Sequence, residues 1–124
     1  MKRFHAVPAT DERYVLGEGP FWDADRHRVL WVDISAGEVY GGTIDDGRVN
    51  PALLLTLPGT VGAVVSSAGG ELLVAGPDRL YTASPRGDVT ASINVPPSPA
   101  EARARASRTT PSTAATSAPS TRTP

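Results

Sequence analysis

The sequence predicts an all-β fold for residues 1–95, on two observations. Short apolar runs alternate with turn residues through this part, and no stretch keeps the i, i+3, i+4, i+7 spacing of an amphipathic helix over three turns. The same succession of strand and turn then occurs a second time, with the period of roughly 40 to 50 residues that is typical of β-propeller blades. We therefore expect about two blade-like repeats, preceded by an N-terminal segment at 1–13.

The first repeat, 14–58, carries the signals of strands joined by short turns. A β-branched and aromatic run follows the polar turn at 23–27, which indicates a strand. Ala36-Gly37 marks the next turn, and Asp45-Asp46-Gly47 tolerates the positive φ angles of a tight hairpin. The expected strands are 28–34, 38–40 and 53–57.

The second repeat, 59–95, aligns with the first at three landmarks. The offsets between matched positions are 43, 43 and 40 residues, which a β-sandwich of unrelated strands would not show. The matched pairs are Gly19 with Gly62, 29–32 with 72–75, and 47–49 with 87–89. Because each propeller blade buries its faces against its neighbours, two repeats alone are expected to self-associate through open sheet edges.

Composition and charge exclude several classes of function. The chain has no cysteine, so disulfides, thiolate metal sites and cysteine nucleophiles are excluded. Of the net charge of −1, the segment 96–124 contributes +3 and residues 1–95 contribute −4, so the folded part has no basic face for nucleic acid. The N-terminal segment is too short and too broken for a signal peptide, and no apolar run reaches membrane-spanning length. We expect a cytoplasmic protein without nucleic-acid or membrane partners.

Glu18 is the candidate metal ligand. It lies within Gly17-Glu18-Gly19-Pro20-Phe21-Trp22, where glycines let the backbone approach a central channel closely and proline fixes the angle at which the chain enters the strand. A carboxylate placed in this way can face a cation in that channel. The alternative is a turn with a solvated acid.

The other candidate residues favour ordinary structural roles. Asp23 and Asp25 lack the glycine and later acids of a calcium loop, so we expect turn formers. His5 and His27 have no partner at ligand spacing and are expected to be exposed. Trp22 and Trp31 are expected to pack between sheets rather than to bind a sugar.

The segments 17–23, 30–34 and 62–65, taken in this order, resemble the family of senescence marker protein (regucalcin), gluconolactonases and related lactonases. The resemblance extends from Tyr14 to Ile93 and implies a six-bladed β-propeller. It also implies that Glu18 binds a divalent cation (Ca2+, Zn2+ or Mg2+) and that a lactone is hydrolysed to a hydroxy acid. In such a reaction the cation polarises the carbonyl and a carboxylate activates water.

The resemblance supplies no catalytic and no substrate-binding residue for this chain. The family's Arg-x-Asn-Asp segment is replaced by 103–111, and its remaining ligands, an asparagine and an aspartate, come from later blades. One carboxylate is a poor site for a hard cation that needs about six oxygen ligands. The prediction is therefore a truncated family member that is inactive by itself, and the alternative is a non-catalytic interaction module. Sugar lactones, aromatic lactones and phosphoesters all remain open as substrates.

The segment 96–124 consists mainly of Pro, Ala, Ser, Thr and Arg and has no Val, Leu, Ile, Phe, Tyr or Trp. Such a composition cannot bury enough apolar surface to offset the ordering entropy, which predicts a disordered tail. A frameshift is the second hypothesis, because a shifted reading of 109–113 can encode Asn-Asp. The coding DNA distinguishes the two.

Overall fold

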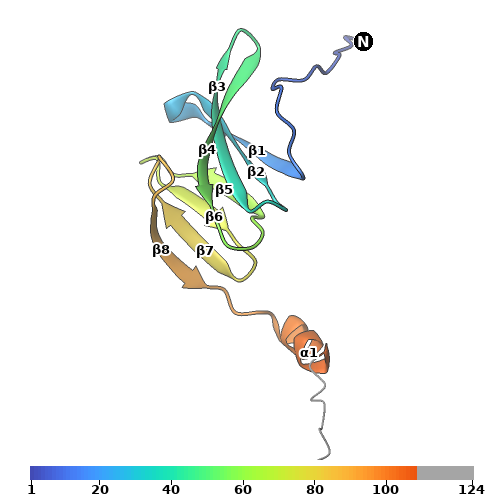
Figure 1. The fold of residues 1–124 in the computed structure, drawn as a ribbon, viewed down its shortest axis with the longest axis vertical. Coiled ribbons are helices and arrows are strands. Elements are labelled where there is room, and N and C mark those ends of the chain that lie inside the picture. The colour runs from blue at the N-terminus through green and yellow to red at the C-terminus, as the bar shows by residue number, and fades with distance from the viewer. Residues whose placement is uncertain (109–124) are drawn as a thin grey trace, which may run out of the picture.

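The computed structural model describes residues 1–108, and its fold is two four-stranded antiparallel sheets followed by one short helix (Figure 1). Each sheet is a meander with its strands in chain order, β1-β2-β3-β4 and β5-β6-β7-β8. This confirms the all-β prediction with two blade-like repeats. The first sheet contains β1 (Gly17–Asp23), β2 (Arg28–Asp33), β3 (Glu38–Asp45) and β4 (Arg48–Thr56), with the 3-10 helix η1 (Ala24–Arg26) between β1 and β2. The second contains β5 (Ala63–Ser66), β6 (Leu72–Ala75), β7 (Arg79–Ala83) and β8 (Val89–Asn94).

The hairpins form where the turn residues predict them. Asp46 and Gly47 have φ angles of 48° and 73°, and they join β3 to β4. Gly87, with φ of 98°, occupies the corresponding turn between β7 and β8. Positive φ favours glycine because a Cβ atom clashes with the neighbouring carbonyl in this region. The aligned glycines of the two repeats therefore share one structural role.

The two sheets pack face to face around one apolar core. Alternate residues of a strand point to opposite faces, and the core-facing set of β2 is Leu30 and Val32, both fully buried. Val61, in the connection between the sheets, is also fully buried. The other core residues are Val39, Leu55, Leu57, Val64, Leu72, Val74 and Ala83.

Tyr14, the first residue of the first repeat, covers part of the opposite face of the first sheet. Trp31 stacks on Tyr40 with ring centroids 5.6 Å apart, and Tyr14 packs edge-on against both rings at 5.8 and 5.0 Å. Trp31 is therefore only 9% exposed, although no second sheet covers it. The expectation that Trp22 packs between sheets is wrong: it pairs with Val29, which alternates with the core residue Leu30, and it is 49% exposed.

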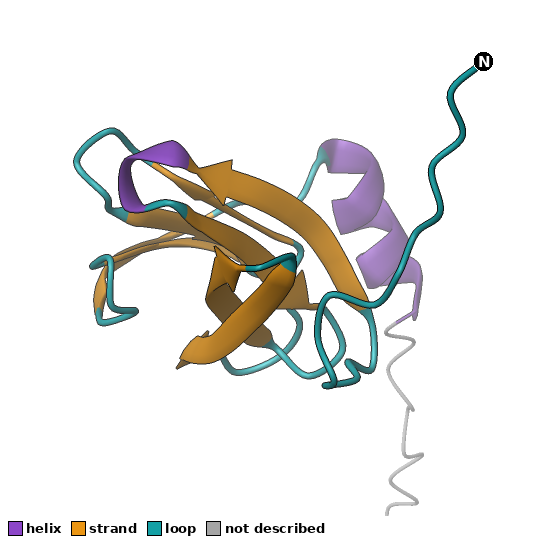
Figure 2. Cartoon of the chain, turned by 90° about the horizontal axis from the view of Figure 1, so that it is seen from above, coloured by secondary structure: helices purple, strands orange, loops and turns teal. Residues whose placement is uncertain are grey.

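The structure differs from the predicted disordered tail over Pro99–Arg108, which form the helix α1. The helical elements of the described chain are η1 and α1 (Figure 2). The reason lies in the first turn: the Ser98 amide donates to the Glu101 carboxylate over 2.8 Å, and the Glu101 amide donates to Ser98 Oγ over 3.2 Å. This reciprocal capping box satisfies two amides that a helix start leaves without partners. The rest of the predicted tail, 109–124, lies outside the described residues.

Candidate functional site

Glu18 lies near the start of β1, opposite Val32, and its side chain is exposed. The pairing of β1 with β2 is irregular between Glu18 and Phe21, and Gly19 inside this irregularity has φ of 61°. A bulge of this kind turns side chains away from the regular pleat and is common beside functional sites. Glu18 pairs with the core residue Val32, and β1 as a whole contacts β5, the first strand of the second sheet.

The described residues do not form a complete cation site around Glu18. Within residues 1–108, no group of three or more His, Cys, Asp or Glu side chains comes together in a way that could hold a metal ion. A hard divalent cation takes about six oxygen ligands. Glu18 can supply one carboxylate of such a set, and its role as a ligand stays a prediction.

Asp33, which is 3% exposed, has a structural role. Its carboxylate accepts hydrogen bonds from the amides of Val15, Leu16 and Ala36 over 2.7, 3.1 and 3.3 Å. Burial raises the pKa of Asp33, but these three amides outweigh it and bring the pKa below its ordinary value. Asp33 thus ties Val15 and Leu16, just before β1, to the turn after β2. It is not a proton-transfer group.

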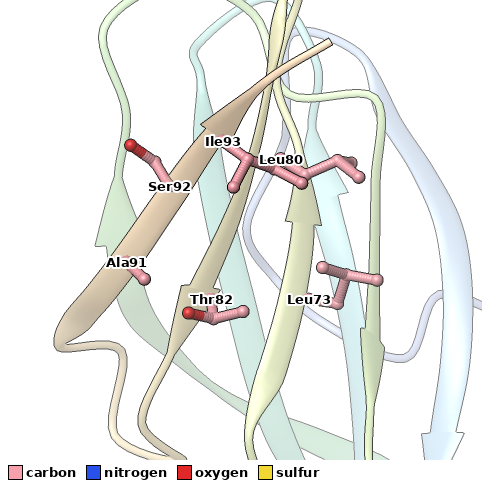
Figure 3. A pocket seen from close by; sticks show the side chains of 6 residues that line it. All are labelled: Leu73, Leu80, Thr82, Ala91, Ser92 and Ile93. Carbon is pink, nitrogen blue, oxygen red and sulfur yellow. The ribbon is translucent and has the colours of Figure 1, made fainter.

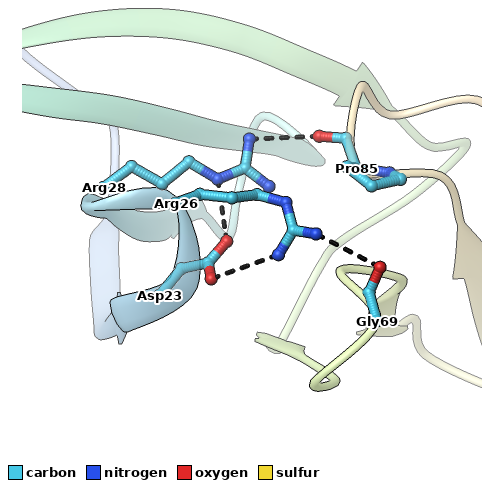
Figure 4. A network of polar contacts seen from close by, with 5 residues as sticks. All are labelled: Asp23, Arg26, Arg28, Gly69 and Pro85. Atoms are coloured by element: carbon cyan, nitrogen blue, oxygen red, sulfur yellow. Dashed lines mark hydrogen bonds and ion pairs between the residues drawn. The ribbon is translucent and has the colours of Figure 1, made fainter.

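Asp23 is the second buried acid, at 2% exposure, and it holds two arginines (Figure 4). Arg28 Nε donates to its carboxylate over 3.0 Å and Arg26 Nη1 lies 3.5 Å away. Each arginine also reaches the second sheet's turns, where Arg26 donates to the Gly69 carbonyl over 3.1 Å and Arg28 to the Pro85 carbonyl over 3.0 Å. The sequence identified Asp23 only as a turn former. Its ion pairs with Arg26 and Arg28 were not predicted. The signal that could have indicated them is the spacing of an acid with arginines three and five residues later.

The remaining candidates give no second site. His5 and His27 are exposed, as expected, and His27 adopts a left-handed φ of 47° at the end of η1. Burial and the hydrogen bond to Glu12 raise the pKa of Tyr14 to about 12. The hydrogen bond to Glu38, with burial, raises the pKa of Tyr40 as well. Both phenols therefore stay protonated near neutral pH and cannot act as bases there.

The second sheet carries a shallow groove on the face turned away from the core (Figure 3). No charged side chain lines it, so it lacks the groups that acid–base or metal chemistry requires. The lining residues are Leu73, Leu80, Thr82, Ala91, Ser92 and Ile93. Over the part of the chain that is described, the single α-helix is too short and too polar to cross a membrane.

Comparisons with known proteins agree with the fold. The family model described as SMP-30/gluconolactonase/LRE-like region matches residues 16–109. The Bacillus subtilis (strain 168) protein YvrE, which is assigned as a sugar lactone lactonase, is 32% identical over 91 residues. The 91 aligned residues make up 73% of this chain and 30% of YvrE. A solved luciferin-regenerating enzyme, a β-propeller, superposes with a TM-score of 0.58 at 19% identity, over 67% of this chain and 31% of that enzyme. The chain thus spans about a third of the length of these relatives.

Proposed function

Because the chain belongs to the SMP-30/gluconolactonase/LRE-like family, we propose that it supplies two blades, 14–58 and 59–95, of a metal-dependent lactonase propeller. The reaction of that propeller is the hydrolysis of a lactone to a hydroxy acid, with a small-molecule lactone as substrate. The family match and the similarity to a sugar lactone lactonase support this proposal. We also propose that the protein is cytoplasmic.

The observation that carries the proposal is the placement of Glu18. It is an exposed carboxylate at the irregular, glycine-containing start of β1, and β1 is the strand of the first sheet that contacts the first strand of the other sheet. In a propeller the first strands of the blades line the central channel, so this is where a ligand to a divalent cation has to lie. We assign Glu18 to that role, with Ca2+, Zn2+ or Mg2+ as the cation.

The 124 residues by themselves are proposed to be inactive. Residues 1–108 contain no group of three or more His, Cys, Asp or Glu side chains that could hold a metal ion, so we expect Glu18 to hold a cation only weakly. No step of the reaction can be assigned to a residue of this chain. Binding of the cation is accordingly expected to be weak and catalysis undetectable.

Calorimetric titration of the chain with Ca2+, Zn2+ and Mg2+ tests the role of Glu18. Glu18→Gln removes the charge at nearly constant shape, and we expect it to abolish the weak binding. Glu71→Gln is the matched control, because Glu71 is likewise an exposed acid beside a strand start, in the second sheet. Equal binding by the wild type and Glu18→Gln would remove Glu18 from the proposed site. Turnover of a sugar lactone by the chain alone would contradict its inactivity.

A non-catalytic interaction module is the second candidate, and the outer strand of the second sheet favours it. All six residues of β8 are exposed and none is charged or proline. In contrast, β4 contains Arg48 and Pro51, and its Val49 amide donates to the Ala9 carbonyl over 2.8 Å. Charges, proline and covering segments protect sheet edges from pairing with other chains. The unprotected β8 is therefore open to a partner, and metal-independent association without turnover is the expected behaviour.

A further inference from the structure

Part of the N-terminal segment lies along β4, the outer strand of the first sheet. The Ala9 carbonyl accepts a hydrogen bond from the Val49 amide of β4 over 2.8 Å. Two residues later, the Asp11 carboxylate accepts from Arg48 Nη2 over 2.6 Å. These contacts join positions that are about 40 residues apart in the chain. We call residues 8–13 the strap.

The chain directly after the strap is held more firmly than the strap itself. Tyr14 packs edge-on against Trp31, and the buried Asp33 carboxylate accepts from the amides of Val15 and Leu16. In contrast, the acid and the arginine of the strap's ion pair are 94% and 49% exposed. An exposed ion pair stabilises little because water and salt screen it. The strap can therefore open locally while the contacts of residues 14–16 stay in place.

The strap satisfies a backbone donor at the edge of the first sheet. The Val49 amide points away from β3, since its acceptor is the Ala9 carbonyl outside the sheet. Backbone groups alternate in direction along an antiparallel strand, so Pro51 has the same outward orientation, and it has no N–H. An outward N–H on an outer strand is the group with which a strand of another chain would pair. Val49 is thus the position at this part of the edge that needs a cover.

We propose that the strap is a releasable cover, which competes with strands of other polypeptide chains for the edge of β4 at Arg48–Asn50. In the closed form, Ala9 occupies the Val49 amide. In the open form, this amide is free to pair with an extended segment of another chain. The pairing uses main-chain groups, and Pro51 confines it to a few residues. The proposal does not depend on lactone hydrolysis or on a cation at Glu18.

Amide hydrogen exchange of Val49, followed by NMR, measures how the strap closes. A variant that lacks residues 2–13 should exchange this amide at least about 10-fold faster than the wild type, because the Ala9 acceptor is gone. A variant that lacks residues 2–7 is the matched control, since the polar contacts with the sheet begin at Pro8, whose carbonyl accepts from Arg48 Nη1 over 3.4 Å. Asp11→Ala should accelerate the exchange by at most about five-fold. Equal Val49 exchange in the two deletion variants would overturn the proposal.

Sedimentation velocity of the purified variants tests the competition for the edge, because the strands available there belong to other copies of the chain. Removal of residues 2–13 should strengthen self-association at least about 10-fold relative to removal of residues 2–7. Adding Val49→Pro to the shorter chain should reverse this gain, since proline lacks the freed N–H and the ladder with β3 does not use it. Association through a side-chain surface would persist in that variant.

Circular dichroism establishes that the variants fold. If Val49→Pro unfolds, Val49→Lys replaces it, because a lysine on an outer strand opposes pairing with another strand. Two results would contradict the competition. One is unchanged self-association after residues 2–13 are removed, and the other is a gain in association that the substitution at Val49 leaves intact.

Discussion

Asp23 and Arg28 form a nearly buried ion pair, 3.0 Å from Oδ2 to Nε, in which the arginine also donates to the Pro85 carbonyl of the other sheet (Figure 4). The side chains of Asp23 and Arg28 are 2% and 13% exposed. The acid therefore orients an arginine that joins the two sheets at the turn between β7 and β8. Contacts of this kind make the packing of the repeats specific, in addition to the apolar core.

Replacing Asp23 by Ala should lower the free energy of unfolding by about 3–5 kcal/mol, because Arg28 would remain buried without its counter-charge. Urea denaturation measures the change. Asp11→Ala is the control, since it removes the exposed partner of Arg48 in another ion pair, and it should cost at most about 1 kcal/mol. Equal losses of unfolding free energy in the two variants would show that the buried ion pair stabilises the fold no more than the exposed one.

Asp33→Asn should destabilise the protein by about 1–3 kcal/mol, because an amide NH2 would face amide donors where the carboxylate accepts three hydrogen bonds. The folded-state pKa of Asp33 is lowered, so its contribution is complete above the unfolded-state pKa and is lost as the pH falls through the folded-state pKa. Stability measured at decreasing acidic pH should therefore fall less steeply for Asp33→Asn than for the wild type. The exposed Asp25→Asn is the control for the loss at neutral pH, and its free energy of unfolding should stay within about 0.5 kcal/mol of the wild type.

Gly87→Ala should destabilise more than Gly47→Ala, although both glycines have positive φ in the corresponding hairpins of the two repeats. A Cβ atom at Gly47 meets nothing within 4 Å, so Ala there costs only the conformational strain of about 1–2 kcal/mol. At Gly87 a Cβ atom would collide with the backbone carbonyl of Leu54 in the other sheet. We expect a further loss of about 1–3 kcal/mol by thermal or urea unfolding. Similar losses would mean that the sheets separate easily at this point.

Ser98→Ala should reduce the helicity of 99–108, because it removes the Oγ acceptor of the capping box. NMR Cα shifts of this segment measure the effect without interference from the sheets. The pKa of Glu101 is lowered by the Ser98 amide, so acidification through that pKa should loosen the same turn. Ser107→Ala, which affects only the last turn, is the control. Unchanged shifts in Ser98→Ala would contradict the importance of the cap.

Most of the fold could be predicted from the sequence because its signals are local. The short apolar runs, the Asp46-Gly47 hairpin and the matched Gly87 turn specify strands and reversals within a few residues of each other. The repeat then indicated the blade architecture. The capping box of Ser98 and Glu101 is equally local, and it was missed because the composition of the tail was given more weight than its helix-start pattern.

For the candidate site, the sequence predicted only one residue, the acid Glu18 in its glycine-containing motif. The sequence by itself determined two strand–turn repeats and an acid between glycines at Glu18. Only the tertiary structure decided that Trp31 is covered by Tyr14 while Trp22 stays exposed, and that Asp23 and Asp33 are buried among donors. It also left Leu73 42% exposed while burying Leu30, its counterpart in the first repeat. The physical reason is that burial and charge pairing depend on which face of a sheet meets another segment, and residues far apart along the chain decide this.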